Sequence, residues 1–233
     1  MVMDVFSKAK AIYVRDVFAQ KQFKGVGIDA ELIPDIVLSE WKKASNTSEI
    51  EKGITIGIIL TNKNKAFRSK ILIALKQFFA KHHCKGCVKV LLSRRWKQDF
   101  LTNLAIQAEL EELGLDSELV IPGNFPSLEK NLSKCHVVIS ENLHGMILST
   151  RNGVPFVAIN NYPKGSPNYT KIVSFVTQVE SESFVINDKV NSEDVFNMIF
   201  TAHDSREKFK VKAKELCEIT EKQSKDFLTE VFR

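Results

Sequence analysis

The stretch HVVISENLHGMIL at residues 136–148, followed by GVPFVAI at residues 153–159, decides how this 233-residue sequence is expected to fold. Residues 136–140 are rich in β-branched side chains, which is typical of a buried strand. Residues 142–151 then read as a helix that Asn152 and Gly153 would end, and a second apolar run follows it. This order of strand, helix and strand predicts a βαβ unit with parallel strands.

The same alternation continues outward from this unit in both directions. The other predicted strands cover residues 54–60, 88–92, 117–121 and 184–187. The other predicted helices cover residues 67–79, 100–113, 127–134 and 169–179, a helix that Ser192 begins, and a long charged helix at residues 205–232. Leu101 and Leu104 are expected on the inner face of their helix, and Ser127 is expected to cap the helix that it begins. The chain is thus predicted to be an α/β protein with a Rossmann-like, doubly wound parallel sheet.

The first 52 residues follow a different pattern from the rest of the chain. Residues 11–14 suggest a short strand, residues 17–24 a helix, and residues 32–37 an extended piece that contains Pro34. This segment is too small to bury a core of its own, so we expect it to pack on something else. The sequence predicts two parts, an N-terminal segment and linker at residues 1–52 and a Rossmann-like domain at residues 53–233.

The composition is that of an ordinary globular chain. Hydrophobic residues make up 44% and charged residues 26%, which excludes extended disorder and fibrous repeats. No apolar run approaches the ~20 residues that span a bilayer, and the start lacks the features of a secretory signal, so we expect a cytoplasmic protein. The net charge of +5 is not gathered into a basic stripe with aromatics, so no nucleic-acid partner is expected.

Cys84 and Cys87 form a C-x-x-C pattern beside His82 and His83. Such a pattern can bind zinc or cycle as a dithiol. A four-ligand zinc site generally needs a second ligand pair, and the sequence offers none at a compatible spacing. We therefore predict no metal site and no bound cofactor, and we expect this stretch to be a turn that Gly86 closes.

Candidate binding residues follow the strand at residues 136–140. In open parallel sheets, ligands collect beyond the carboxyl ends of the strands, where helix N-termini present free N–H groups. His144 is expected there, placed to bind an anion or to transfer a proton, unless it caps the helix or packs under the next loop. Glu141 either serves as an acid or base or complements the helix dipole. Lys164 follows the next strand and either points to the same edge or lies in solvent.

Two motifs resemble the polysaccharide pyruvyl transferase family. The first is a strand, LHG at residues 143–145, a helix, GVP at residues 153–155 and a second strand. The second is AIYVRD at residues 11–16, followed by a helix, Gly27 and PD at residues 34–35, which resembles that family's vRD…G…PD segment. The resemblance implies two Rossmann-like domains with a site in the cleft between them, as in GT-B glycosyltransferases.

The resemblance also implies a function and a set of site residues. Family members transfer a pyruvyl group from phosphoenolpyruvate, the donor substrate, to a hydroxyl pair of a saccharide acceptor, in the synthesis of cell-surface glycans and exopolysaccharides. His144 corresponds to the catalytic histidine that contacts the donor, with Leu143 beside it and Arg15 in the vRD segment. Asn142 stands where many members have arginine. Lys164 corresponds to a donor-binding lysine, with Lys171 as the other choice.

Family members are usually longer, with an N-terminal Rossmann domain that precedes the matched residues. We therefore expect this chain to act as the donor-side half, with an N-terminal domain partner or a second copy of itself completing the cleft. Two alternatives stay open. One is the half of a GT-B-like glycosyltransferase that uses a nucleotide-sugar. The other is a non-catalytic remnant or interaction domain, favoured because Asn142 and Ala19 replace the arginine and serine of many members.

Overall fold

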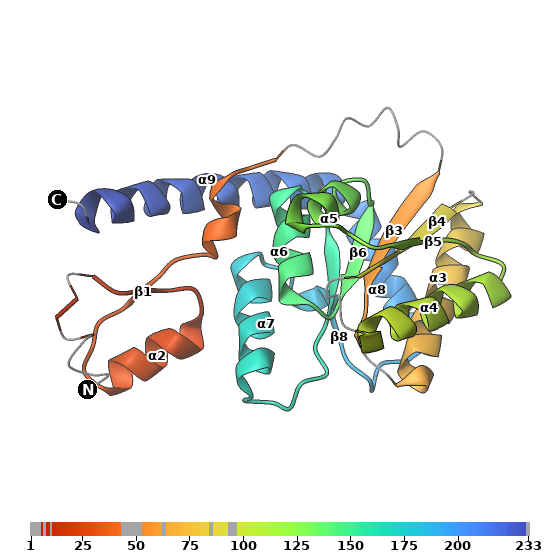
Figure 1. Ribbon diagram of the computed structural model, residues 1–233, viewed down its shortest axis with the longest axis horizontal. Coiled ribbons are helices and arrows are strands. Elements are labelled where there is room, and N and C mark those ends of the chain that lie inside the picture. The colour runs from red at the N-terminus through yellow and green to blue at the C-terminus, as the bar shows by residue number, and fades with distance from the viewer. Residues whose placement is uncertain are drawn as a thin grey trace.

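A six-stranded parallel sheet forms the centre of the main body (Figure 1). The computed structural model describes residues 6, 8–9, 11–42, 53–61, 64–83, 86–92 and 97–231. The strands of this sheet are β3 (Ile54–Ile59), β4 (Gly86–Leu91), β5 (Asp116–Val120), β6 (Val137–Ser140), β7 (Phe156–Ile159) and β8 (Val185–Ile186). They lie in the order β5-β4-β3-β6-β7-β8 with every neighbouring pair parallel, which confirms the predicted fold class.

Helices cover both faces of this sheet. They are α3 (Lys65–His82), α4 (Lys97–Glu112), α5 (Phe125–Leu132), α6 (Leu143–Arg151), α7 (Pro167–Gln178), α8 (Ser192–Asp204) and α9 (Arg206–Val231). Buried side chains of α3, α4 and α8 pack on one face, and those of α5, α6, α7 and α9 pack on the other. None of the helices in the described ranges is both long and apolar enough to cross a bilayer.

Strand β6 shows why a continuous apolar run is required at the centre of the sheet. Val137 and Ile139 belong to the core under α3, whereas Val138 belongs to the core under α6. Because successive side chains of a strand point to opposite faces, a strand covered on both sides needs an apolar residue at every position. This requirement explains why the sequence signal for β6 and β7 is so clear.

The N-terminal segment forms a small βαβ unit of its own. Strand β1 (Tyr13–Val14) and strand β2 (Glu31–Leu32) form a separate two-stranded parallel sheet, with α2 (Val17–Gly25) between them. This unit contacts the main body, since the backbone N–H of Val17 donates to Ser174 Oγ on α7 at 3.2 Å. Figure 1 shows α9 running from the main body to this unit. There the ring centroids of Tyr13 on β1 and Phe227 on α9 lie 4.6 Å apart.

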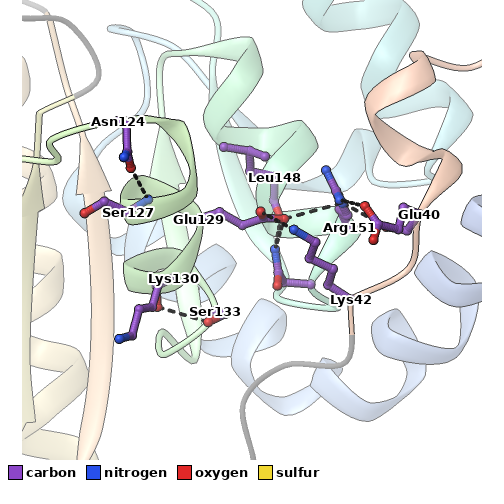
Figure 2. Close-up of polar contacts among 10 residues, drawn as sticks. Glu40, Lys42, Asn124, Ser127, Glu129, Lys130, Ser133, Leu148 and Arg151 are labelled. Atoms are coloured by element: carbon purple, nitrogen blue, oxygen red, sulfur yellow. Dashed lines mark hydrogen bonds and ion pairs between the residues drawn. The ribbon is translucent and has the colours of Figure 1, made fainter.

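A polar cluster anchors the chain that leaves this unit, and we call Glu40, Lys42, Glu129, Arg151 and Asn152 the Glu129 cluster (Figure 2). Glu129 on α5 is buried; its Oε2 accepts from the Lys42 ammonium at 3.0 Å, and its Oε1 accepts from Asn152 Nδ2 at 3.2 Å. Arg151 Nε lies 3.4 Å from Glu129 Oε1, and the guanidinium also pairs with the Glu40 carboxylate. The cluster thereby ties residues 40–42 to the carboxyl end of α6.

Three details of the predicted secondary structure are wrong. In α4 the buried residues are Asn103, Ile106 and Leu110, while Leu101 and Leu104 are exposed. Asn124, and not Ser127, caps α5: its side chain accepts the Ser127 N–H at 3.0 Å. After β2 the chain forms the short 3-10 helix η1 (Ile36–Ser39), not an extended piece, because the Asp35 side chain caps its first turn.

Candidate functional site

A small pocket lies at the carboxyl ends of β3 and β6. These strands are neighbours in the sheet, but β4 and β5 follow β3 to one side whereas β7 and β8 follow β6 to the other. Such a switch point is where open α/β sheets bind their ligands. The pocket is lined by Arg15, Thr61, Glu141, Asn142, Leu143, His144, Tyr162, Asn168, Lys171 and Ile172.

The first turn of α6 forms one wall of the pocket. Asn142 caps the helix, and its Oδ1 accepts the backbone N–H of His144 at 2.8 Å. Ser140 Oγ donates to the Asn142 carbonyl at 2.8 Å, which closes the turn between strand and helix. A Cβ on Gly145 would lie 2.6 Å from Ile59 Cδ1 and 2.7 Å from Ser140 Oγ, so only glycine lets the helix approach the sheet this closely.

The His144 side chain is exposed and lies at the edge of this pocket. Its ring meets the Phe125 ring edge to face, with 6.1 Å between centroids. Asn142 already supplies the helix cap, and neither ring nitrogen of His144 has a partner in the described part of the chain. The structure thus gives the helix cap to Asn142 and places the His144 imidazole, edge to face with Phe125, in the lining of the pocket.

Glu141 is fixed by the loop that follows β3. Its Oε2 accepts from both the backbone N–H and the hydroxyl of Thr61, each at 2.9 Å. The Glu141 backbone N–H donates to the Ile59 carbonyl at 2.9 Å. These bonds join the ends of β3 and β6 across the switch point, and they place a carboxylate in the lining of the pocket.

Two cationic side chains line the pocket. Arg15 Nη1 donates to Asp35 Oδ2 at 2.7 Å, and its side chain remains 44% exposed. Lys171, in the second turn of α7, forms no ion pair with any other residue of the described ranges. Lys164 lies in the exposed loop before α7 and is not part of the lining.

Four of the five site residues predicted from the sequence lie together along this pocket: Arg15, Asn142, Leu143 and His144. Their functional roles stay predictions. Sequence reasoning missed Thr61, although its position just after a strand end at the same sheet edge was a usable signal. Asn168 and Tyr162 were also missed, because their placement depends on the path of the loop after β7.

The pocket is small for a complete ligand site. Its volume is about 150 Å³, whereas pockets for small molecules usually enclose about 300–1,000 Å³. The recess that the described residues form is therefore large enough for the charged end of a ligand but too small to enclose a donor and an acceptor together.

No metal-binding group of three or more His, Cys, Asp or Glu side chains occurs within the part of the chain that the structure describes. Cys84 lies outside those ranges. Cys87 is a free thiol near the amino end of β4, whereas the pocket lies at the carboxyl ends of the strands. Burial raises the pKa of Cys135 to about 12 and that of Cys217 to about 11. These two thiols are protonated at neutral pH, which suits packing and not catalysis.

Comparison with protein families gives a match to a known family. The family model of the polysaccharide pyruvyl transferases matches residues 1–162 of the 233. That range includes both resembling motifs and every lining residue of the pocket except Asn168, Lys171 and Ile172. A search of curated protein sequences finds no match.

Solved structures with a similar fold include several enzymes of sugar metabolism. A putative UDP-N-acetylglucosamine 2-epimerase from Listeria monocytogenes aligns with a TM-score of 0.62 at 11% identity, over 96% of this chain and 60% of its own. Sucrose-phosphate synthase from Thermosynechococcus elongatus gives 0.59 at 12%, over 98% and 60%. A Thermobaculum terrenum O-GlcNAc transferase mutant gives 0.54 at 12%, over 86% and 39%. The chain thus shares the α/β fold of part of these GT-B-type structures, and it spans less than two thirds of each of them.

Proposed function

The chain belongs to the polysaccharide pyruvyl transferase family, and we propose that its pocket binds phosphoenolpyruvate and presents the pyruvyl group to a hydroxyl pair of a saccharide. The observation that carries this proposal is the exposed imidazole of His144, in the first turn of α6 and at the switch point of the sheet. Arg15 and Leu143, the other residues assigned by the family motifs, line the same pocket.

The charges of the pocket suit an anionic donor. The amino end of α6 offers free N–H groups and the positive end of the helix dipole. Arg15 can turn its exposed guanidinium edge toward a phosphate or carboxylate, the groups that its planar fork fits best. We assign the donor-binding lysine to Lys171, since it lines the pocket and Lys164 does not.

The chemistry that we propose needs one proton donor beside the enol carbon. A saccharide hydroxyl oxygen bonds to C2 of the donor, and C3 takes up a proton to become a methyl group. The phosphate leaves with the electrons of the C2–O bond as the second hydroxyl oxygen bonds to C2. Of the two hydroxyl protons, one balances the proton taken up at C3 and the other ends on the phosphate. We propose that His144 holds the proton that moves to C3.

The acceptor would lie outside the pocket. The recess is too small to enclose a donor and an acceptor together, and the chain spans only part of the GT-B structures that it resembles. We propose that an N-terminal domain partner, or a second copy of this chain, supplies the facing wall. The saccharide acceptor would be held between the two.

Donor binding tests the proposal directly. Isothermal titration calorimetry of the chain with phosphoenolpyruvate, UDP-sugars and CMP-sugars should show phosphoenolpyruvate as the preferred ligand. His144→Ala and Lys171→Met should each weaken its binding about tenfold, the usual effect of losing a charged hydrogen bond. Lys164→Met serves as the matched lysine substitution and should change the affinity less than twofold.

Two results would contradict this assignment. Tighter binding of a nucleotide-sugar would support a GT-B-like glycosyltransferase half. Absence of binding by all three ligand classes would support a non-catalytic interaction domain. If Lys164→Met proved as damaging as Lys171→Met, the choice between the two lysines would be wrong.

A further inference from the structure

Glu141 is the acidic side chain in the lining of a pocket that otherwise suits an anion. A carboxylate disfavours a phosphate placed beside it, so its presence needs a purpose within the binding site. The structure fixes its orientation: Oε2 takes two hydrogen bonds from Thr61 at 2.9 Å. In the described part of the chain, the other oxygen, Oε1, has no partner.

The Glu141 carboxylate thus has one oxygen held by Thr61 and a second oxygen that can accept a hydrogen bond from a ligand. Ionised carboxylates only accept hydrogen bonds, so the complementary ligand group carries an O–H or N–H. Repulsion keeps the phosphate and carboxylate of the donor away from Oε1, which leaves this oxygen to an uncharged group. We propose that Glu141 receives a hydroxyl group of the saccharide acceptor and selects for it, with Thr61 as the positioning residue.

This inference rests on the proposed function, because the saccharide is the acceptor named there. It adds a division of the pocket: the cations and the amino end of α6 take the anionic donor, and the Glu141 carboxylate takes the neutral acceptor. The division predicts that removing the Glu141 charge changes the affinities for the two ligands in opposite directions. A merely structural role of Glu141 would weaken the binding of both.

The variant Glu141→Gln tests this division with little change of shape. The amide oxygen of glutamine can still accept hydrogen bonds from both Thr61 donors. The atom at the position of Oε1 becomes an NH₂ group, which is a neutral donor instead of a charged acceptor. Binding of methyl β-galactoside, followed by ligand-observed NMR, should weaken about tenfold, the difference between a charged and a neutral hydrogen bond. Binding of phosphoenolpyruvate, followed by calorimetry, should tighten about fivefold as the repulsion is removed.

Two further samples isolate the cause. Thr61→Val removes the hydroxyl but keeps the backbone donor, so it should weaken galactoside binding less than Glu141→Gln does and leave phosphoenolpyruvate binding unchanged. Glu112→Gln removes an exposed carboxylate at the carboxyl end of α4 and should change neither affinity. Methyl β-galactoside with all its hydroxyls methylated should not bind the wild-type chain, since it has no hydrogen to donate.

Each outcome decides something. The inference fails if Glu141→Gln weakens both ligands alike, if it leaves galactoside binding unchanged, or if the wild-type chain binds no galactoside. The proposed function fails separately, through the absence of phosphoenolpyruvate binding by the wild-type chain. Thermal melts of all variants identify any substitution that acts through unfolding.

Discussion

His136 is a buried side chain just before β6, where the backbone of Thr55 holds it from two directions. The Thr55 N–H donates to Nδ1 of the ring at 3.0 Å, and the His136 N–H donates to the Thr55 carbonyl at 2.7 Å. Burial, followed by the charges of Arg206 and His203, lowers the pKa of His136 from 6.5 to about 4. The folded chain therefore keeps this imidazole neutral at a pH where an exposed histidine is charged.

This shift predicts that the folded state loses stability in mild acid. Between pH 6.5 and 4 the unfolded chain binds a proton at His136 that the folded chain does not, so the free energy of unfolding falls as the pH falls. The expected loss from this residue is about 2 kcal/mol between pH 7.5 and 5. Urea denaturation at both pH values measures it, and burial lowers the pKa of His203 as well, which adds in the same direction.

The variant His136→Gln gives the comparison, since its amide oxygen can accept from Thr55 but cannot titrate. Its free energy of unfolding should depend less on pH, even if it is lower at pH 7.5. An equal pH dependence in the variant and the wild-type chain would show that other groups cause the acid sensitivity.

At the site, the location of a residue could be predicted where it depends on position along a strand and the helix that follows, while the functional roles stay predictions. Asn142 and His144 follow a strand directly, so the fold fixes their places within a few ångströms. The choice between Lys164 and Lys171 could not be made in this way, because it depends on the path of the loop after β7. Thr61 was missed since its importance comes from a contact with Glu141, 80 residues away in the chain.

At the level of elements, the Glu129 cluster joins α5, α6 and the segment that follows η1 (Figure 2). We expect Glu129→Gln to lower the free energy of unfolding by about 3 kcal/mol, because it leaves the largely buried Arg151 guanidinium and the Lys42 ammonium without their shared carboxylate. The pairing of Arg151 with Glu40 keeps the loss near the lower end of the range for buried pairs. Urea denaturation at neutral pH measures the difference.

A surface pair offers the matched comparison for this prediction. Lys225 and Glu221 form an exposed pair one turn apart on α9, and such pairs usually contribute less than about 1 kcal/mol. Glu221→Gln should therefore change the stability by about 0.5 kcal/mol or less. If both substitutions cost the same, burial of the Glu129 cluster does not carry the energy that we assign to it.

The bounds of the predicted elements were most accurate for strands buried on both faces, because a continuous apolar run there fits only one assignment. The strands at the centre of the sheet, such as β3 and β6, lie within a residue of their expected bounds. The predicted buried face of α4 was wrong because two sets of residues in this helix have helical spacing. Tertiary packing buries the set that contains Asn103. The Nδ2 of that asparagine donates to the Asp99 carbonyl at 2.6 Å, while its Oδ1 is buried without a partner in the described part of the chain.

For the whole molecule, a small pocket predicts binding without efficient turnover. Transfer between two substrates depends on holding both in a reactive geometry, which can lower the barrier by ~7–11 kcal/mol. The pocket volume of about 150 Å³ is too small to enclose both substrates. We expect the chain alone, mixed with phosphoenolpyruvate and methyl β-galactoside, to release inorganic phosphate at close to the uncatalysed rate in a colorimetric assay.

Turnover at an ordinary enzyme rate would contradict this prediction. Analytical ultracentrifugation of the active sample would then separate two explanations. A dimer would indicate that a second copy of the chain supplies the facing wall, whereas a monomer would indicate that residues 1–52 complete the cleft.

Helix α6 is nine residues long, about 13 Å from end to end. His144 lies at its amino end and the Glu129 cluster at its carboxyl end. Arg15 enters the pocket from a unit whose outgoing chain is fastened to that cluster. By holding residues 40–42, the Glu129 cluster acts as a short tether on this unit. It keeps the Arg15 guanidinium at a high effective concentration beside the His144 imidazole. Glu129→Gln would then weaken phosphoenolpyruvate binding without any contact with the ligand, and calorimetry on the folded variant would reveal it.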